Sequence, residues 1–355
     1  MTIMWVNLTL VYMFALLARY FSRPLYFGSQ FIKPSKVLVF LVITSLVLVS
    51  GLRNNIGDTY FYMHSYSNTE FSLSNIDFTG DFGFNLLQLF LQTFSSDPQI
   101  LILTTALITN SLIVIALSKY SRIFELAVYV YITSGMFTVS MNGIRQYLAA
   151  GIIFMATKYI LNGNFKKYFF IILLAATFHK TALVLLPIYF IVRRKAWSKV
   201  TFGLIIFSIF IVLGFNLFID LLFTSLSNTQ YGHYSEFQEG GASFLRLAVN
   251  TAPILIAFLG KEKLRELWPK SDYIVNLSII SSLFLVISTQ NWIFARFNIY
   301  FGLYNLVLVS WLIVLFKDNS KKFIYYAILI CYLIFFYYEQ VISLNIVIES
   351  KYFNF

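Results

Sequence analysis

Five basic residues of this sequence lie within or at the end of long apolar runs: Arg53, Arg145, Lys180, Arg246 and Arg296. A charge in the hydrocarbon of a membrane costs about 2.5–3.5 kcal/mol on insertion scales, so such residues usually face a cavity or a partner. The planar guanidinium of arginine binds phosphate oxygens in pairs. The four arginines therefore predict a shared binding site for a diphosphate. The alternative is that each long side chain reaches the lipid headgroups separately.

Two other residues could move a proton beside such a site. His179 lies between two short apolar arms, and an imidazole suits proton transfer near neutral pH. A lone histidine in an apolar run is otherwise a hydrogen-bonded core residue. Asp58 follows a glycine and could act as a base, or it could fix a turn by accepting hydrogen bonds from nearby amides. His179 is the first candidate for the base and Asp58 the second.

Aromatic residues near the same boundary could stack on sugar rings. Tyr60 and Tyr62 follow Asp58 closely, and Tyr231 and Tyr234 lie in a second polar stretch. Tyrosine is also common at membrane interfaces, so both interpretations are open.

The composition predicts a membrane protein. The 355 residues are 59% hydrophobic and 12% charged, whereas a soluble chain is about 45–50% apolar and about 25% charged. Several runs approach the roughly 20 residues that cross a bilayer. We therefore predict an all-α polytopic integral membrane protein, with one transmembrane domain over residues 1–355.

The single cysteine, Cys331, allows no internal disulfide, and three scattered histidines predict no metal site. We expect no cofactor. The apolar runs are 3–18, 37–52, 100–117, 123–141, 143–161, 168–192, 200–219, 243–260, 273–289, 293–316 and 323–338.

Charge predicts the orientation, because cytoplasmic loops are enriched in Lys and Arg. Twenty of the 26 basic residues lie in six loops between the runs. If these loops are cytoplasmic, both termini lie outside and residues 53–81 and 220–242 form outer loops. The net charge of +11 then reflects topology and does not indicate nucleic acid as a partner.

One run conflicts with a single crossing. Basic residues both precede and follow run 168–192, Lys166 and Lys167 before it and Arg193 and Arg194 after it. Both ends should therefore be cytoplasmic, with the chain reversing at an apex near His179. Counting the two arms as short crossings gives about twelve transmembrane segments.

Segment 82–94 is too short to span and is amphipathic. Phe84, Leu87, Leu91 and Phe94 share one helical face, and Asn85, Gln88 and Gln92 share another. This pattern predicts an outer helix at the membrane interface.

Several motifs occur in a fixed order between about residues 45 and 310. They are Arg-x-x-x-Gly-Asp-x-x-x-Tyr from Arg53 to Tyr62, Arg-Gln-x-x-Ala from Arg145, and Ala-x-x-Phe-His-x-Thr-Ala ending at Ala182. "DFGFNLL" and "ARFNIYFGLYN" accompany them. In this order the motifs resemble those of the Wzy/EpsG-type polysaccharide polymerases of bacteria.

The resemblance implies a multi-helix architecture of the GT-C-like kind and a glycosyltransferase of the inner membrane. Its substrates would be oligosaccharide repeat units on undecaprenyl diphosphate, as donor and as acceptor, joined on the periplasmic face without a metal. The product would be O-antigen, capsule or exopolysaccharide. Beyond the lipid bilayer, a chain-length regulator and a flippase would be partners. Further substrate contacts would come from Gln146, Lys180 and Tyr300, besides Tyr60 and Tyr62.

Two other functions fit part of the pattern. An O-antigen ligase would share the arginines and the lipid-linked donor. A flippase or other transporter for lipid-linked oligosaccharide would usually keep acidic residues near the midplane. Here the acids lie in loops or near helix ends, which favours the polymerase.

Overall fold

The structure, a computed structural model, describes residues 1–24, 32–226 and 240–352. Helices make up nearly all of its regular structure, and the sheet within these ranges is a two-residue antiparallel pairing of β1 with β2. The all-α class is therefore confirmed. The strands are β1 (Arg23–Pro24) and β2 (Ile32–Lys33); the helices are α1 (Thr2–Tyr20), α2 (Lys36–Gly51), α3 (Thr59–Asn68), η1 (Leu73–Asn75), α4 (Phe82–Gln92), α5 (Gln99–Tyr120), α6 (Phe124–Thr133), α7 (Met136–Asn142), α8 (Ile144–Met155), α9 (Thr157–Leu161), α10 (Phe165–Phe178), η2 (Lys180–Val184), α11 (Leu185–Val192), α12 (Lys199–Leu213), α13 (Phe215–Leu226), α14 (Phe244–Leu259), α15 (Lys261–Leu267), α16 (Ser271–Ser288), η4 (Trp292–Phe294), α17 (Ala295–Leu312), η5 (Ile313–Leu315), α18 (Asp318–Phe336) and the π-helix η6 (Tyr337–Ser343).

Five helical segments of the described ranges are long and apolar enough to cross a membrane: α1, α5, α16, η4 to η5, and α18 to η6. Three bent pairs raise the number to eight if each pair is one span: α6 with α7 at 56°, α12 with α13 at 93°, and α14 with α15 at 80°. Helices are the expected elements, because a backbone in lipid must satisfy its hydrogen bonds within the segment. A total of twelve spans stays a prediction.

The bends fall at glycines. Gly135 separates α6 from α7 with φ +81°, a left-handed conformation that side chains with a Cβ rarely adopt. Gly214 and Gly260 lie at the other two bends.

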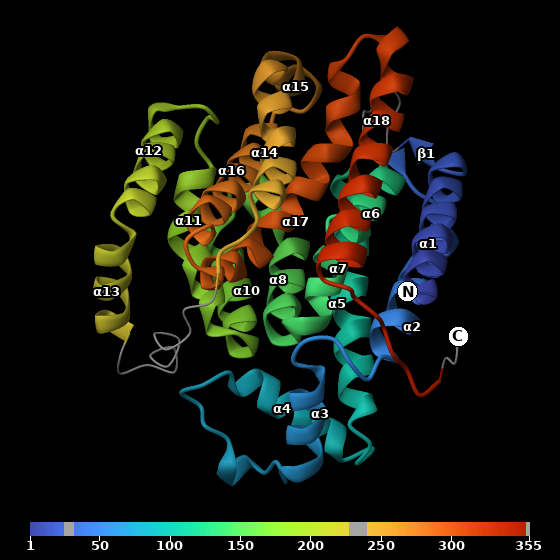
Figure 1. Cartoon of the computed structure of the whole chain (residues 1–355), viewed down its shortest axis with the longest axis vertical. Helices are drawn as coiled ribbons and strands as arrows, with labels where there is room; N and C mark the ends of the chain where they lie inside the picture. Colours follow the sequence, from blue (N-terminus) through green and yellow to red (C-terminus); the bar gives the residue numbers. More distant parts are fainter. Residues whose placement is uncertain (25–31, 227–239, 353–355) are drawn as a thin grey trace.

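The basic loops gather at one end of the bundle, the upper end of Figure 1, where α15 and β1 lie. Lys270 Nζ donates to Asn162 Oδ1 at 3.1 Å, which joins the loop before α10 to the loop before α16. The other end carries Arg53, whose neighbour Asn54 donates its N–H to Glu349 O at 3.0 Å in the C-terminal tail. The tail therefore lies at the end opposite the basic loops.

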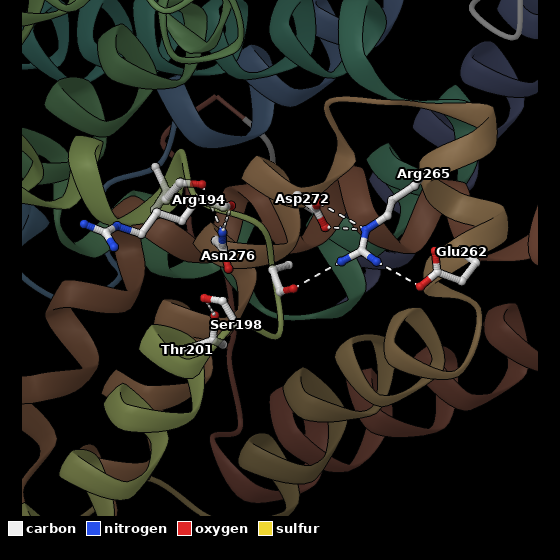
Figure 2. A network of polar contacts seen from close by, with 9 residues as sticks. Arg194, Ser198, Thr201, Glu262, Arg265, Asp272 and Asn276 are labelled. Atoms are coloured by element: carbon white, nitrogen blue, oxygen red, sulfur yellow. Dashed lines mark hydrogen bonds and ion pairs between the residues drawn. The ribbon is translucent and has the colours of Figure 1, made fainter.

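A polar network at the basic end holds the segment after α11 (Figure 2). Arg265 contacts Asp272 Oδ1 at 3.1 Å, Glu262 Oε1 at 3.0 Å and Ala196 O at 3.1 Å. Asn276 Nδ2 donates to Arg194 O at 2.8 Å. The exit from α11 is thereby fastened to α15 and α16.

The segment from α10 to α11 is a helical hairpin. The Phe165 ring, at the start of α10, lies 5.0 Å from the Tyr189 ring and 4.9 Å from the Phe190 ring, near the end of α11. Between the arms, His179 has an extended backbone with φ −156° and ψ 113°. The chain thus reverses at the residue where the charge pattern places the apex, and the hairpin begins and ends at the basic end.

Helices α3 and α4 form a separate lobe beyond the end of the bundle, at the bottom of Figure 1. Tyr66, Phe84 and Leu91 form its small core together with Leu101 and Ile102 of α5. A Cβ at Gly83 would overlap the side chain of Thr177, so the absence of a side chain there lets α4 lie directly against α10. The lobe therefore rests on the hairpin next to its apex.

The expected faces of the amphipathic helix need correction. Phe84 and Leu91 are buried, but Gln88 is 4% exposed and Phe94, beyond the end of α4, is 68% exposed. The physical reason is that α4 packs against other helices of the protein, α10 and α5. A helix at the lipid interface would instead turn its apolar side toward the lipid and its polar side toward water. The Gln92 side chain connects α4 to the end of α3, because its Nε2 donates to Tyr66 O at 2.9 Å and to Thr69 O at 2.7 Å.

The two ends of the bundle should lie on opposite sides of the membrane. In a Cys331→Ser background, Thr69→Cys in the lobe and Lys195→Cys beyond α11 are expected to react with an impermeant maleimide from opposite sides, measured in spheroplasts and in inverted vesicles. The Cys331→Ser chain without an added cysteine is the control for background labelling. Cys331 is replaced because it lies exposed on the apolar helix α18. Reaction of both positions in the same preparation would contradict this topology.

Candidate active site

Arg145 lies in the first turn of α8, at the end of the molecule that carries the lobe. Its Nη1 contacts Asp81 Oδ2 at 3.0 Å, and its Nε donates to the Tyr62 hydroxyl at 3.3 Å. The guanidinium also lies 5.8 Å from the Tyr62 ring centre and 6.0 Å from that of Phe84. Although held by the lobe, the Arg145 side chain remains 41% exposed and can meet a ligand.

His179 is buried at the apex of the hairpin. Its Nδ1 lies 2.7 Å from Thr181 Oγ1, which in turn lies 2.9 Å from the Tyr300 hydroxyl. Arg145 and Arg296 are both close enough to act electrostatically on the imidazole. The hydroxyls fix the ring through Nδ1, and in the tautomer whose Nδ1–H donates to Thr181 Oγ1 the other nitrogen, Nε2, can take a proton.

A cavity of about 260 Å³ opens beside α8, α14 and α17. Two of the predicted arginines, Arg246 and Arg296, line it together with Gln146. Gln146 Nε2 donates to Arg296 O at 2.8 Å, and the guanidinium of Arg296 lies 5.0 Å from the ring centre of Trp292. Arg246 Nε contacts Glu339 Oε1 at 2.8 Å. Two arginines thus line the cavity, Arg246 with its guanidinium paired to Glu339 and Arg296 with its guanidinium over Trp292.

Arg53 occupies a different place from the other three arginines. It is 1% exposed and does not line this cavity. Its guanidinium donates to the carbonyls of Ser50 and Met141, at the ends of α2 and α7, and its Nε donates to Thr59 Oγ1 at 3.1 Å. Helix C-termini leave such carbonyls without partners. Arg53 therefore joins three helix ends and has no exposed surface for a diphosphate.

The turn after Arg53 positions Asp58. Ile56 and Gly57 both have positive φ, +81° and +52°, and a Cβ on Gly57 would overlap the side chain of Asn142. The Asp58 N–H donates to Asn142 Oδ1 at 2.9 Å, and Asn142 lines the cavity. The partly exposed Asp58 is also close enough to act electrostatically on Tyr62. Asp58 thus lies between the cavity and the lobe.

The remaining candidates divide into two groups. Tyr62, Tyr300 and the backbone of Lys180 lie in the network around Arg145 and His179. Tyr60 is 64% exposed and stacks on His64 at 5.7 Å, on the outside of the lobe. Residues 227–239 of the predicted outer loop 220–242 lie outside the described residues, and Tyr231 and Tyr234 are among them.

Two acids at the site were not selected from the sequence. Asp81 holds Arg145, and Glu339 in the π-helix η6 holds Arg246. Asp81 begins the "DFGFNLL" motif and directly precedes an amphipathic helix, a signal that could have marked it. Glu339 has no comparable signal, although π-helical turns often occur at functional sites.

Fold and site together define a polytopic helical membrane protein with an arginine-lined cavity near a buried histidine, at the end away from its basic loops. The family model described as EpsG family matches residues 36–354, so the chain belongs to the EpsG family. Membership of this family suggests a polysaccharide polymerase and thus an enzyme of the glycosyltransferase kind. Neither a curated protein nor a solved structure matches the chain significantly.

The two kinds of arginine should differ when replaced by lysine, which keeps the charge and loses the fork. Arg53→Lys is expected to lower the free energy of unfolding by about 3 kcal/mol, because charged hydrogen bonds to buried carbonyls are lost. Arg246→Lys should leave stability close to wild type, since it can keep its ion pair with Glu339. Melting in detergent, followed by tryptophan fluorescence, measures both. Equal stability of the two variants would remove the structural role of Arg53.

Proposed function

We propose that this protein joins oligosaccharide repeat units carried on undecaprenyl diphosphate at the outer face of the bacterial cytoplasmic membrane. The observation that carries the proposal is the cavity lined by Arg246 and Arg296, close to His179 and at the end opposite the basic loops. A diphosphate linked to a polyprenyl chain is the ligand that suits paired guanidinium groups at a membrane boundary. Family membership supports the reaction class.

The orientation follows from the charge rule. The basic end would be cytoplasmic, and the lobe, the cavity and both termini would face the periplasm or the outside. The shorter helices α2, α8 and α10, together with α11, would complete twelve crossing segments in a GT-C-like arrangement. A flippase would deliver the substrate to this face, and a chain-length regulator would limit the product.

The reaction replaces the bond between the anomeric carbon of the donor sugar and the diphosphate by a bond to the acceptor. An acceptor hydroxyl attacks this carbon and forms the new glycosidic bond, while the bond to the diphosphate oxygen breaks and its electron pair leaves with the diphosphate. Arg246, Arg296 and Arg145 would stabilise the negative charge that develops there. This charge is the one that a metal would otherwise neutralise, so we propose metal-independent chemistry.

The proton of the acceptor hydroxyl needs a base. Nε2 of His179 would take it, with Nδ1–H donating to Thr181 Oγ1, which in turn contacts the Tyr300 hydroxyl. Asp58 is the second candidate for the base. Gln146, Tyr62, Tyr300 and Lys180 would contact the substrate around these groups, and Tyr60 would meet the sugar chain further out. Arg53 would act through the turn that it holds.

The proposed function predicts separate effects on transfer and binding. The assay uses purified protein with synthetic lipid-linked repeat units. It measures separately the joining of two repeat units and the binding of the donor. His179→Ala should lower transfer at least 100-fold with donor binding kept, since general-base catalysis contributes about 10²–10⁴-fold. Arg296→Lys should weaken donor binding, because one guanidinium fork is lost.

The matched control is Arg194→Lys, a substitution at the basic end. A chelator should leave the rate unchanged. Transfer at the wild-type rate by His179→Ala would remove His179 as the base, and transfer only onto lipid A core would indicate a ligase.

A further inference from the structure

The carboxylate of Asp81 joins parts of the site that are distant in the sequence. Oδ2 contacts Arg145 Nη1 at 3.0 Å, and Oδ1 accepts the Lys180 N–H at 3.0 Å. The Asp81 side chain is 7% exposed, and its backbone carbonyl accepts the Phe84 N–H at 3.0 Å at the start of α4. The lobe, α8 and the hairpin apex therefore meet at one carboxylate.

Both partners of this carboxylate depend on it. A buried carboxylate is stable only with good partners, and an ion pair with further hydrogen bonds meets this need. The Lys180 N–H is the first backbone donor of η2, and such donors have no partner within their own helix. The residue just before Lys180 is His179, with an extended backbone. Asp81 thus fixes the peptide next to the proposed base.

The packing of the lobe keeps Asp81 in this position. Asp81 directly precedes α4, and the close approach of Gly83 to Thr177 holds the first turn of α4 on α10. The Phe84 ring lies beneath Arg145 at 6.0 Å. The backbone of Asp81 is therefore fixed by the packing of α4 and not by Arg145.

We propose that Asp81 is a positioning residue of the active site, which holds the His179 apex beside Arg145 and competes with a phosphate group for that guanidinium. The proposal rests on the proposed function for its catalytic consequence. Arg145 would exchange the carboxylate for a diphosphate oxygen on binding, while Lys180 would keep Asp81, and hence the apex, in place. Substrate binding would be weaker than with a free guanidinium, and the base would stay aligned.

Three variants separate the two roles. Asp81→Asn keeps an acceptor for the Lys180 N–H and loses the charge, and Asp81→Ala loses both. Asp77→Asn is the matched control, because Asp77 is an exposed carboxylate of the same loop. Oδ1 of Asp77 accepts hydrogen bonds from the Thr79 N–H at 2.7 Å and from the Thr79 hydroxyl at 2.6 Å. If Asp81→Asn does not accumulate, Asp81→Glu, which keeps the charge and displaces it, takes its place in every measurement.

Two readouts need no polymer formation. Amide hydrogen exchange of the peptide around Lys180 should be at least tenfold faster in Asp81→Ala and near wild type in Asp81→Asn. Inorganic pyrophosphate should bind Asp81→Asn several-fold more tightly than wild type, and Asp77→Asn as wild type does. For Asp81→Glu, faster exchange at Lys180 is expected. Wild-type exchange in Asp81→Ala, or unchanged pyrophosphate affinity in Asp81→Asn, would overturn the proposal.

Kinetics then test the catalytic consequence. With synthetic lipid-linked repeat units, Asp81→Asn should lower KM and keep kcat near wild type, because the apex stays aligned, and Asp81→Ala should lower kcat. A merely structural loss would lower the active fraction and leave KM unchanged. If wild-type protein forms no polymer, the proposed function fails while the exchange and pyrophosphate results still decide on Asp81. If polymer forms and Asp81→Asn has wild-type kcat and KM, only the role of Asp81 fails.

Discussion

The structure depends on one constraint: a charge removed from water must find a partner within the protein. Three acids are buried within the described ranges, and each pairs with an arginine from a distant segment: Asp81 with Arg145, Glu125 with Arg19, and Glu339 with Arg246. Loss of one partner would leave a buried charge that costs several kcal/mol. The pairs therefore fix which helices can be neighbours. Two of them lie at the proposed active site, so stability and ligand binding use the same guanidinium groups there.

Arg53 meets the same constraint in another way. Its charge is satisfied by two backbone carbonyls and one hydroxyl, within the protein and away from the cavity. A motif that contains Arg53, Gly57 and Asp58 can thus be important without Arg53 touching a substrate. The arginine holds the ends of the helices, the glycine allows the turn, and the turn delivers Asp58 to Asn142 at the cavity wall.

The sequence predicted the features that depend on local pattern. Apolar runs marked the helices, and basic residues on both sides of run 168–192 placed the reversal at His179. The features that depend on contacts between distant segments were not predictable in this way. The separation of Arg53 from the cavity, the burial of Gln88 and the pairing of Glu339 with Arg246 each follow from which helix lies opposite. Spacing along one chain carries no information on that choice, so a cluster of four arginines was expected where two line the cavity and a third lies in the neighbouring network.

The helical hairpin has a consequence for biogenesis. The arm from Phe165 to Phe178 has 14 residues, and the second arm ends at Val192, so each is shorter than the roughly 20 residues that a translocon releases as a stable span. Neither arm can be expected to enter the bilayer alone. The pair should insert as one unit after the second arm has left the ribosome, with the basic residues on both flanks retained on the side of synthesis. His179 would then reach its depth late, and its surroundings would be completed only when α17 brings Tyr300 to the apex.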